Sequence, residues 1–372
     1  MPHPDLARYR GARAVVAMSG GVDSSVAAAL LAEAGCDVVG VTMKLWNWAQ
    51  VGGNLDGDRR CCSAEAFDAA RSVARRMGFP FYVLDLADEF HRAVIDDFIG
   101  EYRAGRTPNP CAQCNTHIKW SALAERARML DADFLATGHY ARTEREDVRG
   151  GPVLLRGADD RRDQSYFLWG IPRALLARTI FPLGDLRKDE VRVLAREFGL
   201  PNAERPESRE ICFVADDDYG RFLREHAHLA DSPGDILDVH GQIVGRHEGV
   251  AFYTIGQRKG IGAHGRPVYV TALDPQTNTV HIGAEDDLLS REFVVSDVNW
   301  CSIDPPSQPF TALVKIRYRH TPAPGEIFLQ EGKLCVVFSD AQRAITPGQS
   351  AVFYNGEVVL GGGRIEQVAG QA

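Results

Sequence analysis

Apolar residues follow two alternating patterns along the N-terminal part of the chain. Short apolar, β-branched runs typical of buried strands are separated by stretches in which apolar residues recur every three or four positions, as in helices packed on one face. Strands that alternate with helices predict a parallel sheet covered on both faces. The predicted strands are 14–18, 37–43, 81–86 and 133–137. Apolar stripes predict a first helix that ends near Leu31 and three further helices at 67–77, 90–102 and 118–130.

The pattern changes around residues 201–210. One more helix is predicted at 217–228, and from residue 232 onward short strands alternate with turn dipeptides. Asn355-Gly356 between two apolar runs predicts a β-hairpin. We therefore expect an α/β protein with a parallel-sheet domain at 1–205, a small connecting domain at 206–290 and a β-barrel-like domain at 291–372.

The first strand and the first helix are joined by Ser19-Gly20-Gly21-Val22-Asp23-Ser24. Two glycines allow a tight turn and a close approach to a ligand, and the helix N-terminus that follows offers N–H donors and a positive dipole end. Such a turn suits a phosphate group, although a plain glycine turn before a helix is the simpler interpretation. Ligands of parallel sheets lie beyond the carboxyl ends of the strands, where Met43 and Gly138-His139 also fall.

The turn lacks the Gly-Lys-Ser/Thr of a Walker A loop and the Gly-x-Gly-x-x-Gly of a dinucleotide fold. Ser-Gly-Gly-x-Asp-Ser resembles the PP-loop of ATP pyrophosphatases, which clasp the pyrophosphate of ATP and release AMP after adenylating a substrate. The motif alone is common to GMP synthetase, NAD synthetase, argininosuccinate synthetase and the tRNA-thiolating enzymes. In context it predicts an ATP-binding domain of the adenine nucleotide α-hydrolase-like class.

Composition and charge limit the classes of function. The chain has 372 residues, 45% of them hydrophobic and 25% charged. It has no apolar run near the ~20 residues of a membrane span and no signal-peptide core, so we expect a cytoplasmic protein without a membrane partner. A net charge of −8 argues against a broadly basic nucleic-acid surface. An RNA partner would need a local patch, such as Lys315-Ile316-Arg317-Tyr318-Arg319, which predicts a strand with three cations on one face and Tyr318 on the other.

Eight cysteines in a chain of this length do not indicate a disulfide scaffold. In a reducing compartment they are core residues, metal ligands or catalytic thiols. The stretch 107–115, with two prolines and two asparagines, predicts a loop that carries Cys111 and Cys114. A Cys-x-x-Cys pair can supply half of the ligands of a zinc site, or it can be a redox pair. The sequence has no second Cys-x-x-Cys to complete a zinc site. Cys212 alone would be read as a core thiol.

A set of short motifs follows in order along the chain. The motifs are Ser-Gly-Gly-Val-Asp-Ser-Ser (19–25), Gly-Arg-Thr-Pro-Asn-Pro (105–110), Cys-Asn (114–115), Ala-Thr-Gly-His-Tyr (136–140), Asp-Gln-Ser-Tyr-Phe-Leu (163–168), Ile-Cys-Phe (211–213), Gly-Gln-Arg-Lys-Gly (256–260) and Thr-Pro-Gly-Gln-Ser (346–350). Taken together, they resemble the motifs of the bacterial tRNA-specific 2-thiouridylases. They run from residue 19 into the C-terminal part, so the resemblance covers nearly the whole chain. It implies transfer of sulfur to C2 of the wobble uridine of tRNA.

The resemblance also implies a division of labour. ATP, accompanied by Mg²⁺, would adenylate the C2 oxygen and make AMP a leaving group. Cys212 would carry sulfur as a persulfide supplied by a cysteine desulfurase or a relay protein, and attack by Cys114 would leave a Cys114–Cys212 disulfide. The residues implied in ATP binding are Ala17, Met18, Ser19, Gly20, Gly21, Val22, Asp23, Ser24, Met43 and Gly138.

The implied tRNA acceptors are those for lysine, glutamate and glutamine. Many family members carry Asp where this chain has Cys111, so a general acid–base role does not transfer simply to this position. Three cysteines in one site could instead hold a labile iron–sulfur cluster. The residues implied in tRNA contact are Asn109, Pro110, Cys111, His139, Arg162, Asp163, Gln164, Arg317, Tyr318 and Gln349.

Two alternatives remain open at this point. One is a different PP-loop adenylating synthetase in which the cysteines are structural. The other is a non-catalytic RNA-binding protein that keeps a vestigial ATP site.

Overall fold

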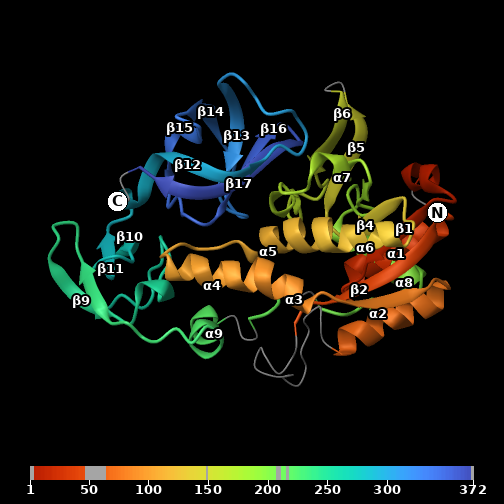
Figure 1. Ribbon diagram of the computed structural model, residues 1–372, viewed down its shortest axis with the longest axis horizontal. Helices are drawn as coiled ribbons and strands as arrows, with labels where there is room; N and C mark the ends of the chain where they lie inside the picture. The colour runs from red at the N-terminus through yellow and green to blue at the C-terminus, as the bar shows by residue number, and fades with distance from the viewer. Residues whose placement is uncertain (1–3, 47–63, 148–149, 207–210, 215–217, 370–372) are drawn as a thin grey trace.

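The computed structural model describes residues 4–46, 64–147, 150–206, 211–214 and 218–369. An N-terminal parallel sheet with its helices, a small four-stranded sheet and a C-terminal barrel follow one another along the chain (Figure 1). The predicted fold class is confirmed. Within the described ranges, no helix is both long and apolar enough to cross a membrane.

The N-terminal sheet has the strand order β3-β2-β1-β4-β7, and all of its pairs are parallel. Valines of β1 and β2 are buried because helices cover both faces of the sheet. The chain extends from β1 toward β3 on one side and toward β7 on the other, so β1 marks the point where the topology reverses and ligands bind. The strands are β1 (Arg13–Ala17), β2 (Asp37–Lys44), β3 (Phe81–Asp85), β4 (Phe134–Thr137) and β7 (Thr179–Ile180), of which the short β7 was not predicted.

The predicted helices are present, some of them divided by wider turns. The second ends where Gly78 adopts a φ of +78°, the left-handed conformation of a helix stop. The long helical run after Cys114 contains a π-helical segment with a kink at Trp120. The helices of this domain are α1 (Val22–Glu33), α2 (Ala64–Met77), α3 (Ala87–Phe90), η3 (His91–Ile95), α4 (Asp96–Arg103), α5 (Pro110–Gln113), η4 (Cys114–Leu123), α6 (Ala124–Met129), α7 (Arg173–Leu176) and α8 (Lys188–Glu197).

The predicted loop at 107–115 is wrong in its second half. Asn109 is the N-cap of α5, where its side chain accepts a hydrogen bond from the N–H of Ala112 at 3.2 Å, and Pro110 occupies the first helical turn. Asn-Pro, read as a turn signal, is here a helix start signal. Cys111 and Cys114 therefore lie three residues apart on a helix and face the same side.

The connecting domain begins with α9 (Tyr219–His226), close to the predicted helix, whose first residue, Asp217, lies outside the described residues. Its sheet has the order β10-β11-β8-β9 around a core of its own that includes Val270 and Val280. The strands are β8 (Gly234–Leu237), β9 (Ile243–His247), β10 (Tyr269–Asp274) and β11 (Thr279–Gly283).

The C-terminal domain is a six-stranded barrel closed by pairing of β12 with β17. The predicted hairpin is confirmed, with Gly356 and Glu357 between its strands. A hairpin from the N-terminal domain, formed by β5 (Ala141–Asp147) and β6 (Gly151–Arg156), adds to the edge of β17, which the sequence did not predict. The barrel strands are β12 (Leu289–Asn299), β13 (Phe310–Lys315), β14 (Ala323–Gln330), β15 (Lys333–Arg343), β16 (Ser350–Asn355) and β17 (Val358–Val368).

The predicted strand at 315–319 is wrong beyond Lys315. The chain turns there, and the N–H of His320 donates to the carbonyl of Arg317 at 3.0 Å. A turn is required because β13 and β14 pair as antiparallel neighbours, so the chain must reverse between Lys315 and Ala323. The predicted alternation of faces fails as well, since the Nζ of Lys315 lies 5.6 Å from the ring of Tyr318 while the guanidinium of Arg317 donates to the carbonyl of Arg343 at 2.6 Å.

A buried ion-pair network joins the barrel to α4, which lies alongside it (Figure 1). Arg364 of β17 contacts Asp97 at 2.8 Å and Glu101 at 3.0 Å, and Arg106 contacts Glu101 from the following loop. Glu101 is only 4% exposed, so these cations offset the cost of burying its carboxylate. The network fixes the barrel relative to the helices that lead to Cys114.

Arg364→Leu is expected to lower the free energy of unfolding by about 3–5 kcal/mol, because it leaves buried carboxylates without a principal cation. Urea unfolding measures this. The matched control is Arg246→Ala, which removes an exposed pair with Asp235 and should change stability by less than about 1 kcal/mol. If Arg364→Leu changed the free energy of unfolding as little as Arg246→Ala, the network would not contribute to docking of the barrel.

Candidate functional site

The turn between β1 and α1 is held in one conformation by its own side chains. Gly20 has a φ of +73°, and a Cβ there would lie 2.2 Å from the carbonyl oxygen of Ala66 in α2, so only glycine fits. The Oγ of Ser24 accepts from the N–H of Ser19 and donates to the carbonyl of Gly21, both at 3.1 Å. Gly21 is the N-cap and offers no capping side chain. The first-turn N–H groups of α1 are thus arranged to receive an anion.

The end of β4 packs directly against this turn. A Cβ on Gly138 would lie 2.6 Å from the backbone nitrogen of Ser24, so the two backbones approach as closely as glycine permits. Strand end, turn and helix start therefore form one rigid unit at the carboxyl edge of the sheet.

A cavity of about 340 Å³ opens beside this unit. Its walls come from segments that lie almost 200 residues apart in the sequence. Both predicted catalytic cysteines are among the lining residues. Phe90, Val94, Phe167 and Phe213 supply an apolar wall. The predicted site residues that line it are Ala17, Met18, Ser19, Asp23, Ser24, Met43, Gly138, Pro110, Cys111, His139, Gln164, Cys114 and Cys212.

The position of Cys212 follows from the residue beside it. Phe213 is 1% exposed and packs edge to face against Phe98 at 5.1 Å and Phe90 at 5.8 Å between ring centroids. This aromatic anchor holds the neighbouring Cys212 at the cavity wall. Cys212 and Cys114 are partly buried, whereas Cys111 is exposed.

A second cavity, of about 970 Å³, meets the first at the PP-loop. Ser19, Asp23, Cys111, Gln164 and Phe167 line both cavities. The second cavity is also lined by Gly21, Val22, Arg162, Asp163 and Tyr318 of the predicted set. It is cationic although the chain is acidic: its walls carry the seven cations Arg156, Arg161, Arg162, Lys188, Arg205, Lys315 and Arg319 against the three carboxylates Asp23, Asp160 and Asp163.

Four predicted residues line neither cavity. Gly20 is inside the PP-loop turn, and Arg317 turns toward Arg343. Asn109 is 9% exposed and its amide donates to the hydroxyl of Ser350 in the barrel at 3.3 Å. Gln349 donates to the carbonyls of both residues before Asn109 at 3.0 Å. Asn109 and Gln349 thus tie the barrel to the start of the cysteine-bearing helix.

His139 belongs to a polar network at the first cavity. Its Nδ1 lies 2.7 Å from the hydroxyl of Thr137 and its Nε2 lies 3.4 Å from the Nζ of Lys119. An ammonium can only donate, so Nε2 accepts and Nδ1–H donates to Thr137. Burial, and secondly the charge of Lys119, hold the pKa of His139 well below its ordinary value of 6.5. The ring is therefore neutral at physiological pH.

The structure brings residues to the two cavities that sequence reasoning missed. Lys119 lines the first cavity and also donates to the side chain of Asn115 at 2.8 Å. The helix start at Asn109-Pro110 would have placed it one turn after Asn115, had that signal been read correctly. Lys188 and Arg205 line the second cavity beside the PP-loop. Their spacing in the sequence did not predict this position.

Metal ligation finds no support in the described part of the chain. Although Cys111, Cys114 and Cys212 share a cavity, no group of three or more His, Cys, Asp or Glu side chains among the described residues is arranged to hold a metal ion.

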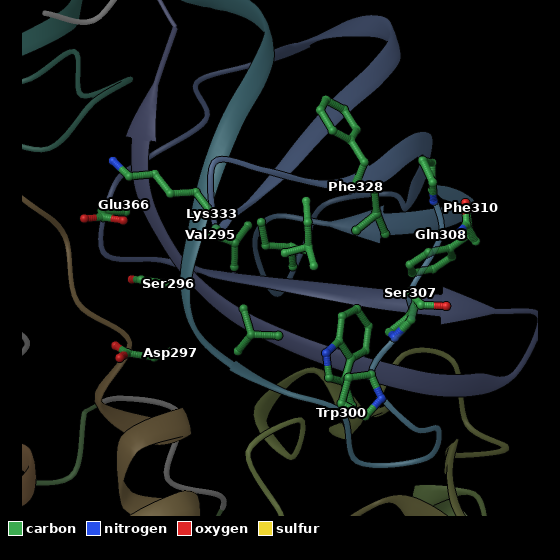
Figure 2. A pocket seen from close by; sticks show the side chains of 18 residues that line it. Val295, Ser296, Asp297, Trp300, Ser307, Gln308, Phe310, Phe328, Lys333 and Glu366 are labelled. Atoms are coloured by element: carbon green, nitrogen blue, oxygen red, sulfur yellow. The ribbon is translucent and has the colours of Figure 1, made fainter.

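A third cavity, of about 510 Å³, lies in the barrel, lined by Trp300, Phe310, Phe328 and Lys333 among others (Figure 2). None of the predicted site residues line it. The candidate site is therefore the pair of cavities on either side of the PP-loop.

Three family models match in chain order: a tRNA methyl transferase HUP domain at 12–216, a tRNA methyl transferase PRC-barrel domain at 221–284 and an aminomethyltransferase beta-barrel domain at 290–365. A solved 4-thiouridine synthetase in complex with RNA and ATP has a TM-score of 0.33 and 19% identity and covers 59% of this chain and 52% of that chain. That likeness is too distant to carry an argument.

Curated relatives are far more similar. The tRNA-specific 2-thiouridylase MnmA of Clostridium perfringens is 46% identical over 358 residues, which is 96% of this chain and 99% of the relative. The proteins of the same name from Carboxydothermus hydrogenoformans and Salinibacter ruber are 47% and 48% identical, over 95% and 96% of this chain and 98% and 95% of their own lengths. The chain therefore belongs to the family of tRNA-specific 2-thiouridylases, which are tRNA sulfurtransferases.

Proposed function

We propose that the protein uses ATP to replace the C2 oxygen of the wobble uridine of tRNA with sulfur. One observation carries the proposal: the PP-loop, Cys114 and Cys212 line a single cavity of about 340 Å³. An oxygen-activating site and two thiols in one chamber match the two chemical needs of the reaction.

The first step activates an inert carbonyl. The residues 17–24, Met43 and Gly138 bind ATP, with Mg²⁺ entering as part of that substrate. The uridine C2 oxygen attacks the α-phosphorus, the bond to the β-phosphate oxygen breaks, and pyrophosphate leaves with the electron pair. Lys119 places a positive charge in the same cavity, where it stabilises the phosphoryl group.

The second step supplies sulfur. A cysteine desulfurase or a relay protein leaves a persulfide on Cys212. Attack of the Cys114 thiolate on the Cys212 sulfur forms a Cys114–Cys212 disulfide and releases hydrosulfide, which attacks C2 and displaces AMP. In the other order, the persulfide attacks C2 directly and Cys114 resolves the adduct. Both orders give 2-thiouridine and a disulfide that an external thiol reduces.

The tRNA enters from the cationic cavity. Lys315 and Arg319 supply charge for phosphates, and Arg162, Asp163 and Gln164 line the same wall. The rings of Tyr318 and Phe167 lie 4.7 Å apart and offer a stacking surface to an extruded base. Extrusion of the uridine costs a few kcal/mol, less in a single-stranded anticodon loop. The proposed acceptors are the tRNAs for lysine, glutamate and glutamine.

Cys212→Ser and Cys114→Ser are each expected to reduce 2-thiouridine formation at least a hundredfold with a persulfide donor, since Cys212 carries the sulfur and Cys114 releases it. Nucleoside analysis of unmodified tRNA after incubation with ATP and the donor measures this. Cys335→Ser, on the barrel strand β15, is the matched control and should retain wild-type activity. Full activity of either site variant would contradict the route of sulfur through these two cysteines.

Gly138→Ala is expected to weaken ATP binding at least tenfold, because the added Cβ would lie 2.6 Å from the Ser24 nitrogen and displace the PP-loop. Equilibrium binding of ATP measures the effect. Gly100→Ala on α4 has open space for its Cβ and should leave ATP affinity unchanged. Unaltered affinity in Gly138→Ala would mean that the contact does not shape the nucleotide site.

The depressed pKa of His139 makes a prediction about stability. Below about pH 6.5 the unfolded chain binds a proton at this position that the folded protein does not, so stability falls as pH falls, by up to about 1.4 kcal/mol per pH unit. His139→Gln removes this contribution and should make the dependence between pH 6.5 and 5 less steep in urea unfolding. His226, His247 and His320, whose pKa values burial also lowers, keep their own contributions. An unchanged slope in His139→Gln would contradict the buried neutral state.

A further inference from the structure

We propose that Lys188, assisted by Arg205, binds the pyrophosphate that leaves ATP, and that its ion pair with Asp23 is the resting position of this side chain. The inference rests on the proposed function and adds a site for the leaving group. It concerns the cationic cavity on the side of the PP-loop away from Met43.

The PP-loop lies between the two cavities, and different residues at and beside it line each one. Ala17, Met18 and Met43 line only the first cavity, whereas Gly21 and Val22 line only the second. A nucleotide with its adenosine in the first cavity would therefore direct its outer phosphates past the turn, into the second. That cavity contains the greater concentration of positive charge.

Lys188 is positioned at the point where those phosphates would emerge. It is the first residue of α8, and its backbone N–H donates to Asp159 at 3.2 Å. Its side chain is only 11% exposed, and its Nζ lies 2.6 Å from the Oδ1 of Asp23. The hydroxyl of Tyr140 donates to the same oxygen at 2.8 Å. The ammonium is thus held at the PP-loop helix rather than in solvent.

The ion pair solves an electrostatic conflict. Asp23 lies in the first turn of α1, where its negative charge competes with phosphate for the positive end of the helix. Lys188 neutralises that carboxylate, so a polyanion can approach. Because the ammonium already lies at the cavity wall, it can donate to a phosphate oxygen without the cost of being recruited from solvent.

Arg205 provides the second cation. Its Nη1 lies 3.4 Å from the carbonyls of Gly20 and Glu65, at the long limit for hydrogen bonds, and the side chain is half-buried. Within the part of the chain that the structure describes, Arg205 has no carboxylate partner. The side-chain amide of Asn202 also donates to the Gly20 carbonyl, at 2.9 Å. The PP-loop therefore keeps this hydrogen bond when Arg205 turns toward a phosphate.

Both cations would act on the bond that breaks. As the uridine oxygen bonds to the α-phosphorus, negative charge develops on the oxygen that bridges to the β-phosphate, and it leaves with pyrophosphate. A cation fixed on that side stabilises this charge in the transition state as well as in the product. Lys188 would therefore assist catalysis in addition to binding.

Binding of magnesium pyrophosphate to the full chain, measured by isothermal titration calorimetry, tests the inference. Lys188→Gln is expected to weaken pyrophosphate binding at least tenfold, the loss of a charge-assisted hydrogen bond, and Arg205→Gln at least threefold. The affinity for AMP, which lacks the outer phosphates, should change less than twofold in both variants and so reports an intact fold. Lys188→Arg should recover most of the lost affinity.

The matched control is Lys44→Gln, which removes a lysine paired with Asp85 at 2.8 Å on the same sheet but outside both cavities. It should bind pyrophosphate as the wild type does. Wild-type pyrophosphate affinity in Lys188→Gln would overturn the inference and leave the proposed function standing. Failure of the wild-type protein to bind ATP or AMP would contradict the proposed function itself, and this inference with it.

Discussion

The close approach of three backbone segments at the carboxyl end of β1 is the constraint on which the rest of the structure depends. Gly20 lets the turn touch α2, and Gly138 lets the end of β4 touch the start of α1. Side chains at these points would push the segments apart, and the N–H groups of the helix start would lose their fixed direction. Phosphate binding by backbone groups requires that direction, since dipoles that must reorient contribute less.

A second requirement is to bring distant thiols to this place. Cys114 comes from a helix whose N-cap, Asn109, is bonded to the barrel, and Cys212 is held by the aromatic anchor of Phe213. The barrel thus does more than line the cationic cavity. Through Arg364 and Gln349 it also fixes the helices and the loop that set the position of the cysteine-bearing helix. This explains why one core cluster runs from Phe98 of the N-terminal domain to Tyr354 of the barrel.

Local sequence patterns predicted those parts of the protein whose structure depends on interactions between residues close together in the sequence. The apolar runs gave the parallel sheet, and Ser-Gly-Gly at a strand end gave the PP-loop. The errors arose where one signal has two meanings: Asn109-Pro110 reads as a turn or as a helix start, and Lys315–Arg319 alternates like a strand but connects two antiparallel strands. The addition of β5 and β6 to the barrel, and the contact of Lys188 with Asp23, are set by tertiary packing, which leaves no periodic trace in the sequence.

We propose that ATP activates the uridine C2 oxygen and that sulfur then displaces it as part of AMP. The most direct test uses tRNA whose wobble uridine carries oxygen-18 at C2, incubated with the protein, ATP and sulfide. Mass spectrometry of the released AMP should then find one oxygen-18 in its phosphate for each 2-thiouridine formed. AMP without the label, or 2-thiouridine formed without AMP, would contradict the account.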